Sequence, residues 1–242
     1  MSLLTLALVA GVGALIGAVG LGGFLMVPLL MLLEGASVRQ GVVVAAVAFL
    51  ASGIVSLLLW RRQPGAARET RGFLLAAAPG AVVGAFAVQA AMEGVLTAFI
   101  AIGFAVAGLA EWLEWPRQGR ARNVGRPAAA GGGLVTGFAS ALTGTSGPMV
   151  AMPMLAWAGL ALRERVALAQ VAQIPIALGA TLAFASFGEV PWTLAAGSSI
   201  ALCAGLVGGA LLARRVQARG LRRLAAVLMW GAAAFMVLKT QW

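Results

Sequence analysis

The sequence predicts an all-α membrane protein made of two inverted repeats, each with a broken or re-entrant helical hairpin followed by three transmembrane helices. Three observations lead to this fold class. The composition is very apolar, two glycine-interrupted apolar segments lie half a chain apart, and the arginines gather in short stretches between apolar runs.

The composition places the chain in a membrane. Hydrophobic residues make up 62% of the chain, the mean hydropathy is +1.00, and charged residues account for only 10%. A soluble domain could not bury so much apolar surface. The net charge of +10 could indicate nucleic-acid binding, but arginines in short loops between apolar runs are typical of membrane proteins. We therefore expect a lipid bilayer and no nucleic acid as partners.

The residue types that are missing limit the chemistry. The sequence has no His, no Asp, no Tyr and one cysteine, Cys203. A histidine-based triad and a metal-ligand cluster are therefore excluded, and no nucleophile–base pair can be drawn. We expect that the chain is not an enzyme and that it holds neither a metal nor a cofactor.

Two apolar segments are interrupted at matching positions. The first runs through Gly20–Pro28 and the second through Thr145–Pro153, so that Pro28 and Pro153 are 125 residues apart. Irregular backbone at membrane depth is tolerated only where protein or a wet cavity satisfies its polar groups. A matched pair of interrupted membrane helices is the best sequence indication of a transporter's substrate site.

Apolar runs, cut at charges and turn residues, divide the chain into two repeats of equal design. In the first repeat, residues 1–113, we expect a broken hairpin at 3–33 and membrane spans at 38–60, 73–91 and 94–112. A cytoplasmic linker follows at 114–129. In the second repeat, residues 130–242, we expect a broken hairpin at 130–160 and spans at 166–187, 191–213 and 221–239.

Glycines outside the breaks recur at the same offset. Gly80 and Gly84 correspond to Gly205 and Gly209, again 125 residues later. Their repetition indicates a duplication. We expect their role to be structural, because small residues four apart let two membrane helices approach closely.

The positions of the basic residues distinguish two ways of folding the broken segments. If all eight apolar segments span the membrane, 9 Lys and Arg residues lie on one side and 8 on the other. If both broken segments are re-entrant, 15 share one side and only Arg39 and Lys239 lie opposite. The bias of basic residues toward the cytoplasm favours the second arrangement, with both termini outside. Each half then has an odd number of spans, so the halves insert in opposite directions.

The breaks offer an anion site. The two returning half-helices would begin near Phe24 and Met149, and a helix N-terminus presents unpaired N–H groups and partial positive charge. Candidate substrate-binding residues in the first break are Gly20, Gly22, Gly23 and Phe24. Those in the second break are Thr143, Thr145, Ser146, Gly147 and Met149. The alternative for the hydroxyl groups is that they satisfy the backbone of their own hairpin.

Two carboxamides lie in the middle of a predicted span. Gln170 and Gln173 are three residues apart, so they share one face of the helix. Polar side chains at that depth normally point inward and are often functional. They are candidate substrate-binding residues. The alternatives are a helix–helix hydrogen bond or a cover for the carbonyl freed by Pro175.

The two breaks resemble those of the sulfite exporter TauE/SafE family of bacterial permeases. The motifs that carry the resemblance are Gly20–Gly23 with Pro28, and Gly144–Pro148 with Pro153. It extends over nearly the whole chain. It implies movement of sulfur oxyanions or organosulfonates, commonly outward, and a place in the bacterial cytoplasmic (inner) membrane.

The leading hypothesis is thus a permease for a small sulfur-containing anion, working by alternating access at a midplane site between the two half-helix N-termini. Two other hypotheses stay open. The chain could carry another small anion or a neutral solute through the same architecture, or it could be a non-transporting scaffold or accessory protein. The partners expected are a small anionic substrate and the bilayer, with a homodimer as an open alternative.

Overall fold

A computed structural model of the chain describes most of its residues. The described residues are 1–20, 22–60, 68–113, 125–145, 147–157, 160, 162–188, 190–212 and 218–240. Several predicted features fall outside them, among them Ser146 and most of the predicted linker at 114–129.

The described part of the chain is built from α-helices. The first half contains α1 (Leu3–Val19), the 3-10 turn η1 (Gly23–Leu25), α2 (Met26–Leu33), α3 (Val38–Trp60), α4 (Arg68–Ala90) and α5 (Glu93–Trp112). The second half contains α6 (Arg126–Thr143), α7 (Pro148–Trp157), α8 (Leu162–Ser186), α9 (Trp192–Leu212) and α10 (Ala218–Thr240). The prediction of an all-α protein is confirmed, and both broken segments are interrupted where the sequence predicts.

Five helices in the described residues are long and apolar enough to cross a bilayer, namely α3, α4, α5, α8 and α9. They coincide with five of the six predicted spans. The sixth predicted span lies within α10, which is 23 residues long. Together these helices confirm an all-α membrane protein.

Four helices, α4, α6, α8 and α10, begin three to five residues before the predicted apolar runs. Helix α6 begins at Arg126, inside the predicted linker, rather than at residue 130. The reason is Pro127, which lies in the first turn of α6. Its fixed φ and missing N–H suit the first helical positions, so the proline starts the helix instead of ending the linker.

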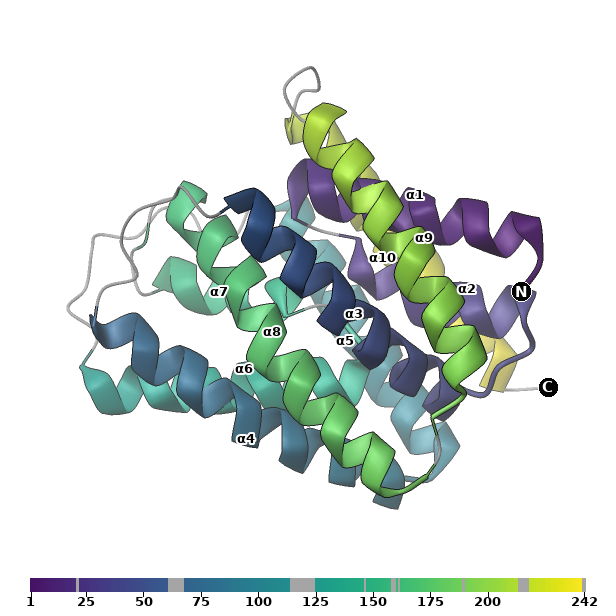
Figure 1. The fold of residues 1–242 in the computed structure, drawn as a ribbon, viewed down its shortest axis with the longest axis horizontal. Helices are drawn as coiled ribbons and strands as arrows, with labels where there is room; N and C mark the ends of the chain where they lie inside the picture. Colours follow the sequence, from purple (N-terminus) through teal and green to yellow (C-terminus); the bar gives the residue numbers. More distant parts are fainter. Residues whose placement is uncertain are drawn as a thin grey trace.

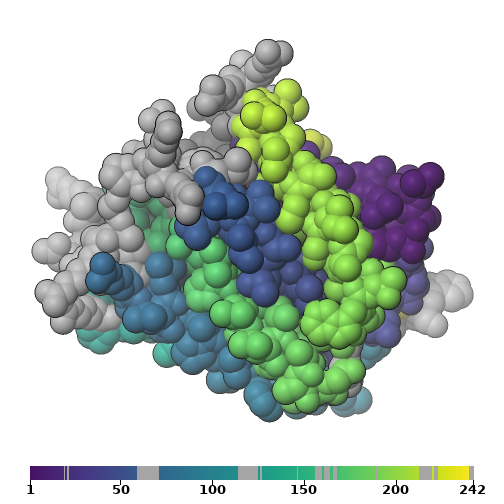
Figure 2. Space-filling view, viewed as in Figure 1, coloured from purple at the N-terminus to yellow at the C-terminus, as the bar shows by residue number. Residues whose placement is uncertain are grey.

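The helices α3 and α8 form the centre of the molecule. In the most apolar 18-residue window of each, 61% of α3 and 67% of α8 are buried, against 33–39% in α4, α5 and α9. Figure 2 shows α3, in dark blue, between α8 in green and α9 in lime. Any site at the α3–α8 contact is therefore at the core of the fold.

Glycines allow two helix pairs to pack backbone against backbone. Helix α4 packs along α6, and α9 crosses α1 (Figure 1). A Cβ atom placed on Gly84 would be 2.5 Å from the carbonyl oxygen of Phe138, and one placed on Gly209 would be 2.6 Å from Cα of Ala14. The predicted packing role of these glycines is confirmed.

Helix pairings recur between the two halves. The pairing of α4 with α6 has its counterpart in α9 with α1, and that of α4 with α8 in α9 with α3. Helix α3 packs on α8, and α5 packs on α10. If α1–α5 are matched in order to α6–α10, each of these pairings maps onto another or onto itself.

Three hydrogen bonds gather the predicted outer segments at one end of the molecule. Thr5 at the start of α1 donates its hydroxyl hydrogen to Glu34 at the end of α2, at 2.5 Å. Lys239 donates to the carbonyl oxygen of Met31 at 2.9 Å. Arg39 donates to the carbonyl oxygen of Ala91 at 3.0 Å. The first broken segment therefore begins and ends at the same end of the fold.

Candidate functional site

The first break is a sharp turn between α1 and α2. Helix α1 ends at Gly20, whose φ of 76° is left-handed and whose N–H bonds to the carbonyl oxygen of Ile16. Such a glycine is the ordinary end of a helix, because it has no Cβ to clash. Gly22 follows with a φ of 145°, and Gly23 begins η1. Leu21 lies outside the described residues.

The second break repeats this design. Helix α6 ends at Gly144, with a φ of 59° and an N–H bond to the carbonyl oxygen of Ser140. Thr145 also donates its N–H to that oxygen, at 3.2 Å. Helix α7 then begins at Pro148, with Gly147 just before it.

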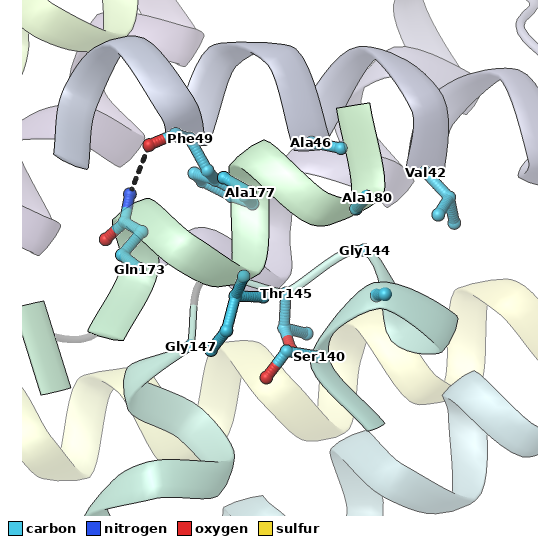
Figure 3. Close-up of a pocket in the computed structure, with 12 residues that line it drawn as sticks. Val42, Ala46, Phe49, Ser140, Gly144, Thr145, Gly147, Gln173, Ala177 and Ala180 are labelled. Atoms are coloured by element: carbon cyan, nitrogen blue, oxygen red, sulfur yellow. Dashed lines mark hydrogen bonds between the residues drawn. The ribbon is translucent and has the colours of Figure 1, made fainter. Parts of the chain in front are cut away.

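A small cavity lies where the second break meets α3 and α8 (Figure 3). Helix α3 contributes Val42, Ala46 and Phe49; the end of α6 and the second break contribute Ser140, Ala141, Gly144, Thr145 and Gly147; α8 contributes Gln173, Ile176, Ala177 and Ala180. The centres of water-sized molecules can occupy about 10 Å³ of it, which is room for about one water molecule.

Gln173 is fixed at this cavity by hydrogen bonds to α3. Its Nε2 donates to the carbonyl oxygen of Phe49 at 2.9 Å and to Oγ of Ser52 at 2.7 Å. Because a backbone carbonyl can only accept, the carboxamide nitrogen must face Phe49. Oε1 of Gln173 is therefore left as an acceptor, and it is buried without a hydrogen-bond partner.

Gln170 lies one turn before Gln173, nearer the start of α8. Its Oε1 accepts a hydrogen bond from Oγ of Ser56 at 3.3 Å, and its side chain is 3% exposed. The two glutamines thus share the helix face that the sequence predicts, and both contact α3. This agrees with the helix–helix alternative and also places Gln173 at the cavity.

The threonines of the second break bond to each other. Thr143 donates to the carbonyl oxygen of Ala139 at 2.7 Å, and its Oγ1 lies 2.8 Å from Oγ1 of Thr145. A hydroxyl has one hydrogen, so Thr145 is the donor in that pair. Both hydroxyl hydrogens are used inside the hairpin, as the structural alternative expects, while Thr145 still lines the cavity.

Ser140 supplies the hydroxyl that is not committed. It is 1% exposed, lines the cavity, and its Oγ has no hydrogen-bond partner. A buried polar group without a partner costs about 1–3 kcal/mol, so Ser140 and Oε1 of Gln173 are natural contacts for a bound molecule or water. Lysine and arginine are missing from the described residues that line the cavity.

The first break contacts the second without lining this cavity. Phe24 packs edge-to-face on Phe104 of α5, with ring centroids 5.9 Å apart, and both side chains are buried. Val27, in the first turn of α2, lies against Gly144. Of the predicted site residues, Thr145, Gly147 and Gln173 line the cavity. Those elsewhere in the described structure are Gly20, Gly22, Gly23, Phe24, Thr143, Met149 and Gln170.

Sequence reasoning missed three serines that the structure brings to this region. Ser140 lines the cavity, while Ser52 and Ser56 bond to the two glutamines. Ser52 and Ser56 are four residues apart and so share one face of α3, just as Gln170 and Gln173 share one face of α8. That matched spacing is the signal that could have found them.

The acidic residues of the described structure lie apart from the cavity. Glu34 caps the end of α2, where the hydrogen bond from Thr5 lowers the pKa of its carboxyl below the ordinary value. In the described residues no three His, Cys, Asp or Glu side chains come close enough to hold a metal ion. The chemistry available at the cavity is therefore hydrogen bonding by neutral groups, and Gly147, which directly precedes α7, is among the lining residues.

The chain matches a known protein family. The family model described as "Sulfite exporter TauE/SafE" matches residues 4–236. Neither a curated protein nor a solved structure matches the chain.

Proposed function

Because the chain belongs to the sulfite exporter TauE/SafE family, we propose that it is a permease that carries a small, singly charged sulfur oxyanion or organosulfonate outward through the cavity at the second break. Family membership supports a membrane transporter of sulfur anions. The observation that carries the choice of site is the cavity itself, which joins Thr145, Gly147 and Gln173 at the core of the fold.

The site would hold the anion with neutral donors. The N-terminus of α7, directly after Gly147, would supply about half a positive charge, and Ser140 supplies a free hydroxyl. A doubly charged anion buried without a cation would be very costly, so a single charge is favoured. An anion that carries its own O–H can also donate to Oε1 of Gln173, as a protonated sulfite would.

The proposed architecture is a pair of inverted repeats. The recurring helix pairings and the left-handed glycines that end α1 and α6 support it. Each broken segment would enter and leave the bilayer by one face. For the first broken segment, the hydrogen bond from Thr5 to Glu34 supports this, because it joins the start of α1 to the end of α2. The repeats would be residues 1–113 and 130–242, joined by a cytoplasmic linker.

The proposed orientation puts the arginine-rich loops in the cytoplasm and both termini outside, in a bacterial inner membrane. The contacts of Arg39 and Lys239 support it, because they bring the two oppositely placed cations to the same end as Glu34. The substitutions Gly35→Cys and Glu164→Cys should then be labelled by a membrane-impermeant thiol reagent from opposite sides of the membrane.

The cavity admits about one water molecule, so binding of a sulfite-sized anion has to widen it. Alternating access supplies that widening, because one repeat rocks against the other around a site at the midplane. A cavity this small fits a conformation between the two open ones.

The test is transport by reconstituted protein. Proteoliposomes are assayed for flux of sulfite, thiosulfate, sulfate, taurine, sulfoacetate and the singly charged methanesulfonate, with wild type, Ser140→Ala and Gly147→Val. Loss of a hydrogen bond to a charged ligand should lower flux about tenfold or more in Ser140→Ala. Ser198→Ala on α9 removes a fully buried hydroxyl away from the cavity and is the matched control.

Two results would contradict the proposal. Wild-type protein that is monodisperse but carries none of these anions would favour the scaffold hypothesis. Unchanged flux in both Ser140→Ala and Gly147→Val would remove the cavity as the site.

A further inference from the structure

A line of buried polar side chains leaves the cavity along the contact of α3 with α8. Its members are Ser52 and Ser56 on α3 and Gln170 and Gln173 on α8, which we call the polar seam. Every member is 0–3% exposed. Gln173 bonds to Ser52, and Ser56 bonds to Gln170 one turn farther from the cavity.

The seam runs toward the end of the molecule where α3 ends and α8 begins. We call it the arginine-rich end, because in the sequence Arg61 and Arg62 follow α3, and Arg163 and Arg165 lie at the start of α8. On α3 it passes from Ser52 to Ser56 and on toward the helix end at Trp60, which Arg61 and Arg62 follow in the sequence. On α8 it passes from Gln173 to Gln170 and on toward Arg165. Arg165 is only 8% exposed, so a buried cation lies about 7.5 Å along the helix beyond Gln170.

The other end of the cavity differs. Val42 and Ala46 of α3 line it there, together with Ala177 and Ala180 of α8. Figure 3 shows Val42, Ala46 and Ala180 on the side of the cavity away from Gln173, with Ala177 nearer to it. The cavity is thus polar toward the arginine-rich end and apolar toward the opposite one.

Helix–helix adhesion alone does not account for the seam and its surroundings. Hydrogen bonds between membrane helices stabilise them when polar groups are satisfied. Here Oε1 of Gln173, Oγ of Ser140 and Oγ1 of Thr136 are all buried without a hydrogen-bond partner. Ser140 and Thr136 are four residues apart on α6, so Thr136 lies one turn toward the arginine-rich end. Three such atoms are costly in a permanently dry contact, and hydration in another conformation would satisfy them.

We propose that the polar seam is the aqueous route between the cavity and the arginine-rich side, and that the contact of Ser56 with Gln170 is the point at which this route closes. The inference rests on the proposed function. Two side-chain hydrogen bonds of the seam join α3 to α8. The bond from Ser56 to Gln170 is the longer, at 3.3 Å against 2.7 Å for the bond from Gln173 to Ser52, and is therefore the weaker of the two.

The single cysteine of the chain makes the test direct. In a Cys203→Ala background, cysteines are introduced one at a time as Ser56→Cys, Val42→Cys and Ser198→Cys. Each is treated with a membrane-impermeant, negatively charged maleimide, added from one side of sealed membrane vesicles and then from the other. Ser198 is 0% exposed on α9, away from the seam, and so controls for burial and for the Ser→Cys change.

We expect Ser56→Cys to react several-fold faster than Ser198→Cys, and only from the arginine-rich side. Val42→Cys should not react from that side faster than the control. An excess of methanesulfonate, a singly charged organosulfonate that does not react with maleimide, should slow the labelling of Ser56→Cys. Labelling of Ser56→Cys that is no faster than the control, that comes from the opposite side, or that methanesulfonate leaves unchanged in protein that transports methanesulfonate would overturn the inference.

Flux measured on wild-type protein separates this inference from the proposed function. Protein that transports sulfur anions while Ser56→Cys stays unreactive keeps the function and loses the route. Protein that transports none of them while Ser56→Cys labels from the arginine-rich side loses the function and keeps a water-filled route.

Discussion

Gly144 lies directly against Val27: a Cβ atom placed on Gly144 would be 2.7 Å from Cγ2 of Val27. These residues belong to different halves of the chain, one at the end of α6 and the other in the first turn of α2. The two breaks therefore touch at the core of the protein. The contact depends on a residue without a side chain in a left-handed conformation.

Gly144→Ala should destabilise the protein. A left-handed conformation costs a non-glycine residue about 1–2 kcal/mol, and overpacking against Val27 and Val42 adds about 1–3 kcal/mol. Gly35→Ala is the matched control, since Gly35 has a φ of +65° but open space around its Cβ position. The measurement is the free energy of unfolding of each variant in mixed detergent micelles. An equal effect of the two substitutions would show that Gly144 has no packing role.

Gly209→Ala should push α9 away from α1, because the added methyl would meet the backbone of Ala14. We expect a loss of about 1–3 kcal/mol and a lower yield of folded protein. The neighbouring Gly208 has nothing within 4 Å of its Cβ position, so Gly208→Ala should be neutral or slightly stabilising. The measurement is the thermal unfolding temperature of the two variants. A lower unfolding temperature for Gly208→Ala than for Gly209→Ala would contradict the packing of α1 on α9.

Phe24→Ala and Phe104→Ala should each cost about 3–5 kcal/mol, because both rings are fully buried. A double-mutant cycle should find a coupling of about 0.5–1.5 kcal/mol from their edge-to-face contact. Phe86 and Phe187 form a similar contact, but Phe86 is 53% exposed, so its replacement should cost much less. Additive losses for Phe24 and Phe104 would mean that the rings do not stabilise one another.

Stability near Glu34 should depend on pH. The hydrogen bond from Thr5 lowers the pKa of Glu34 in the folded protein, so its contribution is present above about pH 4.3 and is lost as the pH falls through the lowered folded value. Thr5→Val should bring the folded pKa back toward its ordinary value and flatten that acid dependence. Thr97→Val, which removes a hydroxyl bonded only to the carbonyl of Glu93, should leave it unchanged. The measurement is the free energy of unfolding as a function of pH for wild type, Thr5→Val and Thr97→Val. An acid dependence that is the same in wild type and Thr5→Val would contradict the role of Thr5.

The breaks and the long helices could be predicted from the sequence for a physical reason. Glycines and prolines such as Gly20 and Pro148 change the backbone locally, and about 20 apolar residues suffice to cross a bilayer. The packing glycines Gly84 and Gly209 were also predictable, because their spacing alone allows helices to approach.

The cavity could not be predicted in the same way. It depends on which helix faces which, and the apolar residues of α3 are spread around the whole helix, so they give no direction. Ser52 and Ser56 look like ordinary membrane serines until α8 brings Gln170 and Gln173 against them. Likewise, nothing near Phe24 in the sequence indicates that Phe104 of α5 packs on its ring.

The glycine contacts of α1 with α9 and of α4 with α6 have a mechanical consequence. A helix whose neighbour's backbone fills the space of a missing methyl cannot shear or roll along that neighbour without collision. Each pair should therefore move as one rigid unit. The contact of α3 with α8 is looser, since a Cβ atom placed on Gly53 would be 3.5 Å from the backbone nitrogen of Ile174, so we expect relative motion of the two halves to be taken up there.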